Sequence, residues 1–242
     1  MRVATWNLEK PPGNKGARQD RQREWIEKTR ADVWVFTESH VTVSPGPDFT
    51  GVCSPHEESG QVWTAIWSRL PIEPLVATGD PTRTACARVT PPRGPPVVVF
   101  GSVLPWLGSR WEGKPSAGGV AFQAALSAQR QDWAELRRRH PDCEFILAGD
   151  LNQDLSVKHF YGSHANRAAL RAALQATGLQ CLTAGQADPA RVQTQGQWAA
   201  VDHICASEGL AARVVGPATC WPPGDRPDKA LSDHFGVVVE FG

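Results

Sequence analysis

The sequence lacks a net charge, because 25 lysines and arginines balance 25 aspartates and glutamates among its 242 residues. It therefore has no overall positive field of the kind that draws proteins to nucleic acid, which leaves room only for a local basic patch. It also lacks an uncharged stretch of membrane-spanning length. No internal repeat and no low-complexity linker interrupts it, so we expect a single domain spanning residues 1–242 that does not associate with membranes.

Cysteine pairs at metal-binding spacing are missing as well. None of the six cysteines forms a C-x-x-C pair, which argues against a zinc ribbon. Several lie in apolar runs, as Cys205 does, and this is typical of small buried residues. The first residues hold no apolar core of signal-peptide length. A cytoplasmic protein with reduced thiols is the simplest expectation.

Apolar runs typical of buried strands alternate with segments of helical periodicity. This mixture along the whole chain predicts an α/β fold. The expected strands are 2–6, 32–37, 61–67, 85–89, 97–104, 144–149, 201–206, 213–215 and 235–241, and the expected helices are 19–30, 120–139 and 167–177.

Polar side chains stand at the ends of these apolar runs. Strand ends are rigid and the loops after them leave room for a ligand, so binding sites are commonly built there. Seven such residues at the edges of five runs indicate convergence on one cleft. Their carboxylates are the ligands that Mg²⁺ prefers, whereas no His/Cys cluster has zinc spacing. The seven are Asn7, Glu38, Asp150, Asn152, Asp202, Asp233 and His234.

Five short motifs, each weak alone, occur in a fixed order. With these motifs the chain resembles the endonuclease/exonuclease/phosphatase superfamily from Arg2 to Phe241, nearly its whole length. The resemblance implies a deoxyribonuclease-I-like fold: a four-layer αββα sandwich in which two mixed β-sheets pack face to face with helices outside. The motifs are Trp6-Asn7, Thr37-Glu38, Gly149-Asp150-Leu151-Asn152, Val201-Asp202-His203 and Ser232-Asp233-His234.

The resemblance also implies a Mg²⁺ or Mn²⁺ cofactor and a metal site. Glu38 would bind the ion directly, Asn7 would lie beside it, and Asp233 would lie near it. Phosphoester hydrolysis needs such a charge to neutralise the phosphate oxygens, together with an activated water.

The remaining motif residues would act on the substrate. Asp150 would orient or deprotonate the attacking water, and Asn152 would hydrogen-bond a phosphate oxygen. His234 would contact the phosphate or transfer a proton, with Asp202 holding its imidazole, because a carboxylate on one ring nitrogen fixes the tautomer and raises basicity. In this superfamily water activation is sometimes assigned to the histidine instead, and the sequence leaves both assignments open.

One position departs from the family pattern. Members usually carry His or Tyr just inside the strand before the long loop, and here Val103 stands at that place. Either Ser102 or a loop residue substitutes for it, or the metal alone stabilises the leaving oxygen.

Tryptophans and basic residues in three loops are candidate substrate contacts, since such residues stack on bases and bind phosphates. The alternative is that the tryptophans pin their loops to the domain. His159, Tyr161 and His164, after the Asp150 motif, are expected to have solvent or packing roles. The candidates are Trp106, Arg110, Trp111, Trp198, Trp221 and Arg226.

Three functions remain open at this stage. The first is a divalent-metal-dependent phosphodiesterase, a monomeric nuclease acting on DNA or RNA. The second is a phosphatase or diesterase for a small phosphorylated metabolite or lipid head group, which the neutral net charge favours somewhat because binding of a phosphate backbone is usually electrostatic. The third, a non-catalytic binding module, is disfavoured because the whole constellation is present.

Overall fold

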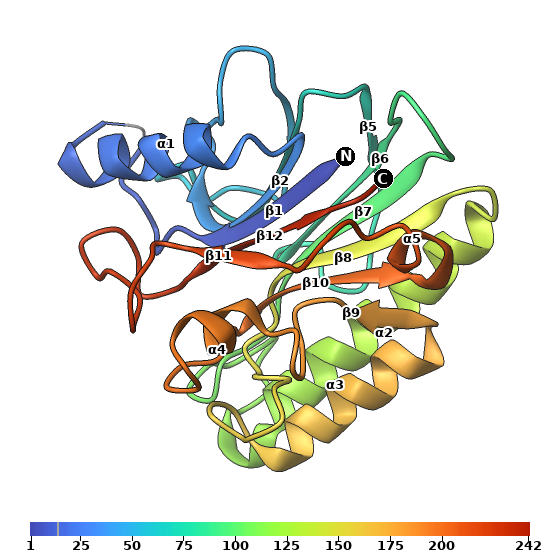
Figure 1. Ribbon diagram of the computed structural model, residues 1–242. Coiled ribbons are helices and arrows are strands. Elements are labelled where there is room, and N and C mark those ends of the chain that lie inside the picture. Colours follow the sequence, from blue (N-terminus) through green and yellow to red (C-terminus); the bar gives the residue numbers. More distant parts are fainter. Residues whose placement is uncertain (14) are drawn as a thin grey trace.

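The computed structural model describes residues 1–13 and 15–242. Two six-stranded mixed sheets face each other, and helices lie on the outer faces (Figure 1). This arrangement confirms the predicted αββα sandwich.

The first sheet has the strand order β11-β12-β1-β2-β4-β3. Strands β1 and β2 run parallel, and the other neighbours pair antiparallel. The strands are β1 (Arg2–Asn7), β2 (Val33–His40), β3 (Thr50–Cys53), β4 (Gln61–Ser68), β11 (Thr219–Trp221) and β12 (Gly236–Glu240).

The second sheet has the order β5-β6-β7-β8-β10-β9, and only β7 and β8 run parallel. Its strands are β5 (Ile72–Leu75), β6 (Thr84–Val89), β7 (Val97–Val103), β8 (Glu144–Asp150), β9 (Leu179–Cys181) and β10 (Asp202–Ser207).

Helices cover both sheets. Helix α1 (Ala17–Thr29) lies outside the first sheet, and α2 (Val120–Arg139) and α3 (His164–Ala176) lie outside the second (Figure 1). Three short helices occur in connecting segments: η1 (Ala117–Gly119), α4 (Pro189–Gln193) and α5 (Glu208–Ala211). No helix in the described ranges is long and apolar enough to cross a membrane. All six cysteines are free thiols.

The central strands are continuously apolar because both of their faces are buried. Successive side chains point to opposite faces, so alternate residues serve different layers. In β2, Val33 and Val35 join the core between the sheets, whereas Trp34 and Phe36 pack under α1. The same alternation in β7 and β8 divides their residues between the inter-sheet core and the layer beneath α2 and α3.

The sequence missed four strands, and all four are sheet edges: β3, β5, β9 and β11. They are only three or four residues long and partly exposed, so they carry no long apolar run. Strand β5 contains Pro74, which an edge strand tolerates because no ladder hydrogen bond is needed on its outer side. The strand expected at 213–215 is wrong, because only Val214 forms a single bridge there, with Phe241.

Gly101 marks a point where the two sheets approach closely. A Cβ atom at Gly101 would lie 2.4 Å from Cγ2 of Thr64 and 3.1 Å from Cγ1 of Val35 on the facing sheet. We expect Gly101→Ala to lower the free energy of unfolding by about 1–3 kcal/mol through overpacking. Urea denaturation measures it. Gly46→Ala, whose new Cβ would meet only Phe49 at 3.8 Å, is the control and should change stability by less than about 0.5 kcal/mol. Equal effects of the two substitutions would contradict this view of the sheet interface.

Candidate active site

The topology brings the polar strand ends to one end of the sandwich. Asn7 ends β1, and Glu38 lies near the end of the parallel strand β2. Asp150 ends β8, and Asp202 begins the antiparallel strand β10 directly opposite Asp150. His234 precedes β12, which runs antiparallel to β1. Five strands from both sheets therefore deliver their polar residues to the same cleft.

His234 and Asp202 form a close pair. The imidazole Nδ1 lies 2.5 Å from Oδ2 of Asp202, which is almost fully buried. Burial lowers the pKa of His234, but the negative charges of Asp202, Asp150 and Asp233 and the hydrogen bond to Asp202 outweigh it and raise this pKa to about 10. The pair is therefore an ion pair at neutral pH, with the imidazolium presented to the cleft.

The loop carrying His234 is fixed to β1. The hydroxyl of Ser232 donates to the backbone carbonyl of Asn7 at 2.7 Å and accepts the His234 backbone N–H at 3.1 Å. The indole of Trp6 donates to the carbonyl of His234 at 3.2 Å. These contacts hold the backbone of His234 in a fixed position relative to β1.

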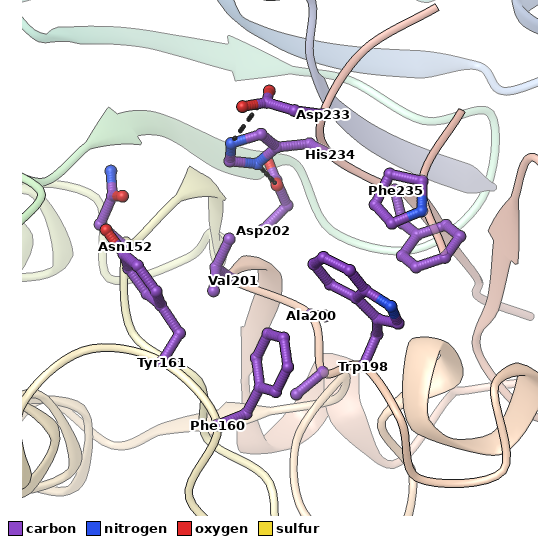
Figure 2. A pocket seen from close by; sticks show the side chains of 12 residues that line it. Asn152, Phe160, Tyr161, Trp198, Ala200, Val201, Asp202, Asp233, His234 and Phe235 are labelled. Carbon is purple, nitrogen blue, oxygen red and sulfur yellow. Dashed lines mark hydrogen bonds and ion pairs between the residues drawn. The ribbon is translucent and has the colours of Figure 1, made fainter. Parts of the chain in front are cut away.

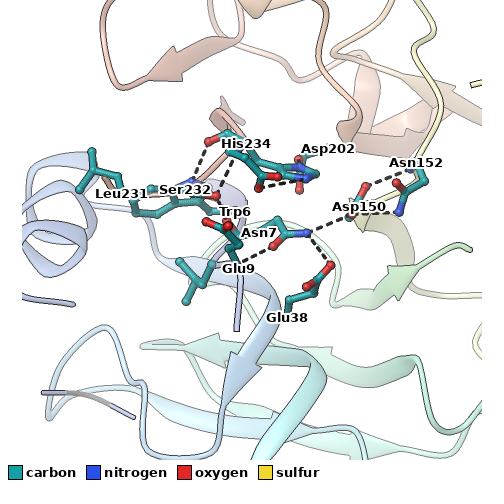
Figure 3. Close-up of polar contacts among 12 residues, drawn as sticks. Trp6, Asn7, Glu9, Glu38, Asp150, Asn152, Asp202, Leu231, Ser232 and His234 are labelled. Atoms are coloured by element: carbon teal, nitrogen blue, oxygen red, sulfur yellow. Dashed lines mark hydrogen bonds and ion pairs between the residues drawn. The ribbon is translucent and has the colours of Figure 1, made fainter. Parts of the chain in front are cut away.

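A second group centres on Asp150 (Figure 3). Its Oδ2 accepts hydrogen bonds from the side-chain amides of Asn7 at 3.0 Å and Asn152 at 2.9 Å. The Asn7 amide also donates to Oε1 of Glu38 at 3.2 Å, so Asn7 bridges the two carboxylates. The second amide hydrogen of Asn152 goes to the carbonyl of Leu104 at 2.9 Å. Both amide hydrogens of Asn152 are thus used within the protein. The sequence had instead suggested that Asn152 hydrogen-bonds a phosphate oxygen.

Two residues of this group have a left-handed backbone. Glu38 has φ 46° and Asn152 has φ 51°. Such values are uncommon for residues with a side chain, least so for Asn, and they gather at functional sites where the surrounding structure holds them. The reversal at Glu38 interrupts the strand pattern and directs its carboxylate into the cleft.

The carboxylates of the cleft are short of positive charge. Burial, with the charges of Asp202 and Glu38, raises the pKa of Asp150 to about 7, although His234 acts to lower it. Among the described residues, the buried Oδ1 of Asp202 finds no hydrogen-bond partner. Ligand atoms of Asp150, Asp202 and His234 all lie within 4.8 Å of one another. The carboxylate oxygens of Asp150 and Asp202 are ligands of the kind that a divalent cation prefers, and such an ion would offset their negative charge.

The predicted metal ligands lie in the same cleft, though in unequal positions. Glu38 lies beside Asp150 through Asn7. The carbonyl oxygen of the Asn7 side chain accepts the Glu9 backbone N–H at 2.8 Å. The side chain of Asp233 is about half exposed, and its Oδ1 lies 3.7 Å from Nε2 of His234.

Two adjoining hollows open over this centre. The larger, about 400 Å³, contains the carboxylates, and the smaller, about 210 Å³, has a largely apolar wall (Figure 2). The larger is lined by Glu9, Lys10, Glu38, Trp106, Asp150, Asn152, Tyr161, Asp233 and His234. The smaller shares Asn152, Tyr161, Asp233 and His234 and adds Phe160, Trp198, Ala199, Ala200, Val201, Asp202, Pro227 and Phe235.

Only two of the six predicted substrate contacts line a hollow: Trp106 in the larger and Trp198 in the smaller. Arg110 and Arg226 are exposed but line neither. Trp111 packs against the core beneath the second sheet. Trp221 is 4% exposed and is buried in the core under the first sheet.

The prediction for Trp221 and Trp111 is therefore corrected: these rings hold the fold together. The ring of Trp221 lies 5.7 Å from those of Trp6 and Trp34, in edge-to-face contact with both. Aromatic pairs of this geometry are favourable. Because the ring of Trp221 is buried in these contacts, it is not available to stack on a base.

Val103, at the position where family members usually carry His or Tyr, does not face the cleft. Val103 is fully buried. The hydroxyl of Ser102 donates to Oε1 of Gln129 on α2 at 2.6 Å and is itself buried. Neither residue lines the cleft, so the alternative that Ser102 substitutes is excluded.

The sequence missed several lining residues. Glu9 and Lys10 follow Asn7 and turn into the cleft through left-handed backbone, with φ 54° and 51°. Lys10 Nζ lies over the ring of Trp63 at 4.7 Å, and the buried guanidinium of Arg83 stacks on the same ring at 4.6 Å. Proximity to Asn7 was the only available signal for Glu9 and Lys10. The sequence suggested a solvent or packing role for Tyr161 and did not single out Phe160, yet both line a hollow.

A sequence model of the Endonuclease/Exonuclease/phosphatase family matches residues 4–234. The chain belongs to this family. The match covers all five motifs, and family membership supports a phosphoric ester hydrolase. No curated protein matches the sequence significantly.

Solved structures show the same fold as this family member. The 3′ phosphatase NExo from Neisseria, bound to a product DNA hairpin, is 18% identical with a TM-score of 0.69, over 100% of this chain and 99% of its own. The endonuclease domain of TRAS1, a telomere-specific non-LTR retrotransposon, is 18% identical with a TM-score of 0.66, over 99% and 97%. The AP endonuclease LMAP from Leishmania major is 15% identical with a TM-score of 0.68, over 98% and 86%.

Proposed function

We propose that the protein is a Mg²⁺- or Mn²⁺-dependent phosphodiesterase that cleaves nucleic acid. The observation that carries this proposal is the convergence of the His234–Asp202 pair and the Glu38–Asn7–Asp150 group on one cleft. One group presents a cation and the other presents unneutralised carboxylates. This is the division of charge that a bound metal and a phosphate between the groups require.

Glu38 is the residue that would hold the divalent ion, with Asn7 orienting its carboxylate and Asp233 nearby. When bound, such an ion neutralises charge on the phosphate and lowers the pKa of its water. The surplus of carboxylates over cations among the lining residues supports this assignment.

The two acid–base groups divide the remaining work. The pKa of Asp150, raised to about 7, suits a group that accepts a proton from the attacking water near neutral pH. The pKa of His234, raised to about 10, suits a cation that stays protonated and donates to the phosphate. These directions favour Asp150 as the proton acceptor and His234 as the electrostatic contact, one of the two alternatives left open by the sequence.

Nucleic acid is supported as the substrate by the walls of the cleft. Trp106 is 39% exposed and lines the hollow that contains the carboxylates, while Trp198 lines the apolar one. Exposed aromatic rings beside a phosphate site can stack on bases or sugars. Lys10 adds a local positive charge in a chain without net charge. The similar folds of an AP endonuclease, a retrotransposon endonuclease and a DNA 3′ phosphatase agree with this choice.

Incubation with end-labelled DNA and RNA, single- and double-stranded, tests the proposal. We expect cleavage of at least one substrate with Mg²⁺ or Mn²⁺ and none with EDTA. Absence of metal-dependent cleavage of all four substrates would reject the nuclease assignment.

The second candidate is hydrolysis of a small phosphorylated metabolite or lipid head group. The smaller hollow, about 210 Å³ with an apolar wall of Phe160, Trp198 and Phe235, is large enough for part of such a molecule. Phosphate release from a panel of small monoesters and diesters separates the two candidates. Turnover of a small ester in the absence of any nuclease activity would favour the second.

Substrate binding is expected to depend on the two tryptophans that line the hollows. We expect Trp106→Ala and Trp198→Ala each to raise KM about tenfold with a smaller change in kcat, since stacking contributes about 1–3 kcal/mol per base. Arg110→Ala is the control, because Arg110 is exposed on the same loop as Trp106 but lines neither hollow. Steady-state kinetics on the preferred oligonucleotide measures all three. A larger KM effect from Arg110→Ala than from the tryptophans would place the substrate elsewhere.

A further inference from the structure

The donors available to a phosphate in this cleft are fewer than its residues suggest. Asn7 uses both side-chain amide hydrogens on Glu38 and Asp150, and Asn152 uses both of its own on Leu104 and Asp150. Neither amide can also donate to a substrate without breaking these bonds. Among the residues that line the larger hollow, Lys10, Trp106, Tyr161 and His234 keep a side-chain donor.

Lys10 Nζ lies over the ring of Trp63 at 4.7 Å. His234, whose Nε2 lies 3.7 Å from the Asp233 carboxylate, is already the proposed cation for the phosphate. The indole N–H of Trp106 belongs to a ring proposed to stack on the substrate. Tyr161 is different, because it lines both hollows together with His234 (Figure 2). In the view of Figure 2 its ring extends toward Asn152, which also lines both hollows.

The phenol oxygen of Tyr161 lies against the long loop. The backbone of Leu107 forms a hydrogen bond with it that lowers the pKa of Tyr161. Burial raises this pKa, as do the charges of Asp150 and Asp233, and the net shift is upward. The phenol therefore keeps its proton at neutral pH and presents it as a donor.

The loop beneath Tyr161 is built to hold it. The buried carboxylate of Asp154 accepts the backbone N–H groups of Phe160 and Tyr161, each at 2.9 Å. The Asp154 N–H in turn donates to the carbonyl of Tyr161 at 3.3 Å. The buried Gln153 accepts the Ser163 N–H at 3.1 Å. The fully buried Asp154 carboxylate also accepts the Ser156 hydroxyl at 2.8 Å and lies 3.0 Å from His159 Nδ1, so a connected polar network fixes the loop that carries Tyr161.

We propose that Tyr161 is a further catalytic residue, whose hydroxyl donates a hydrogen bond to the phosphoester in the cleft. Tyr161 supplies the polar contact that a His or Tyr at the position of Val103, at the end of β7, usually makes in the family. This inference rests on the proposed phosphoester hydrolysis, and it replaces the packing role that the sequence suggested for Tyr161. No bond is made or broken at the phenol, which acts through its hydrogen bond alone.

The kinetic test is Tyr161→Phe, which keeps the ring and removes only the hydroxyl. We expect kcat to fall about 100-fold, the loss typical for one donor to a developing negative charge, with KM changed less than about threefold. The matched control is the double variant Phe160→Tyr/Tyr161→Phe, which restores one phenol one residue away. It should stay as slow as Tyr161→Phe. Unchanged kcat in Tyr161→Phe would overturn the proposal.

A binding test works without turnover. The chain contains one tyrosine, so 3-fluorotyrosine labelling gives a single ¹⁹F resonance. We expect inorganic phosphate with Mg²⁺ to shift this resonance in the wild type, and the shift to be lost in His234→Ala, where the phosphate contact is missing. A resonance that does not move with phosphate overturns the role of Tyr161. If the wild type hydrolyses no phosphoester but the resonance does move, the proposed function fails while the phenol–phosphate contact stands.

Discussion

His234→Ala is expected to lower kcat by about 10²–10³-fold at saturating metal, because it removes the imidazolium that faces the phosphate. The metal concentration for half-maximal activity should change little, since Glu38, Asn7 and Asp150 are left in place. Single-turnover cleavage of the preferred oligonucleotide measures both quantities. If His234→Ala retained full turnover, the non-catalytic binding module would become the better reading of the fold.

Asp202→Asn is the companion variant to His234→Ala. It keeps the shape of Asp202 and removes the charge that sits 2.5 Å from the imidazole. If the two residues act as one unit, the double variant should be about as slow as His234→Ala alone. Independent losses that multiply would show that Asp202 acts separately from His234.

The His234–Asp202 ion pair also predicts a pH dependence of stability. The folded pKa of His234, about 10, lies above its unfolded value of about 6.5, so the pair stabilises the folded state fully below about pH 6.5. That contribution is lost as the pH rises toward 10. The stability advantage of the metal-free wild type over Asp202→Asn should therefore shrink between these pH values, as measured by urea denaturation in EDTA. An advantage that grows with pH would contradict the ion pair.

Glu38→Gln is expected to raise the metal concentration for half-maximal activity by at least about 10- to 100-fold. Loss of a hydrogen-bond partner of a metal ligand typically weakens metal binding by this much, and Glu38 is proposed to be a ligand itself. At saturating metal, kcat should recover to within about tenfold of the wild type, because His234 and Asp150 remain. Titration of the cleavage rate with Mg²⁺ and with Mn²⁺ measures the effect.

Glu57→Gln is the control for Glu38→Gln, since Glu57 is exposed and lines neither hollow. It should leave the metal titration unchanged. The reverse pattern, in which His234→Ala shifts the metal titration and Glu38→Gln only slows turnover, would exchange the roles given to the two groups.

The convergence of the site could be predicted because it depends on strand ends. Asn7, Glu38, Asp150 and Asp202 lie at or near the ends of buried strands. Long apolar runs in the sequence predict such strands. Once the family resemblance fixes which strands are parallel, these ends must meet. The edge strands β3, β5, β9 and β11 lack this signal because they are short and partly exposed.

Side-chain direction in loops could not be predicted in the same way. Trp198 and Trp221 both precede motif residues, yet Trp198 lines a hollow and Trp221 packs against Trp6 and Trp34. The difference arises from β11, an edge strand that turns Trp221 into the core. Asp154 binds the backbone N–H of Tyr161 within the loop that carries Tyr161 to the cleft, and a loop contact of this kind leaves no periodic pattern in the sequence.

The most direct test of the central claim is cleavage of the preferred oligonucleotide in ¹⁸O-labelled water with the divalent metal present. If the cleft between the two sheets directs a metal-assisted water onto phosphorus, one ¹⁸O atom should appear in the product phosphate group. No product should form with EDTA, and the rate of labelled product formation should fall about 10²–10³-fold in His234→Ala. Cleavage that persists in EDTA and in His234→Ala, or product phosphate without the label, would contradict the account.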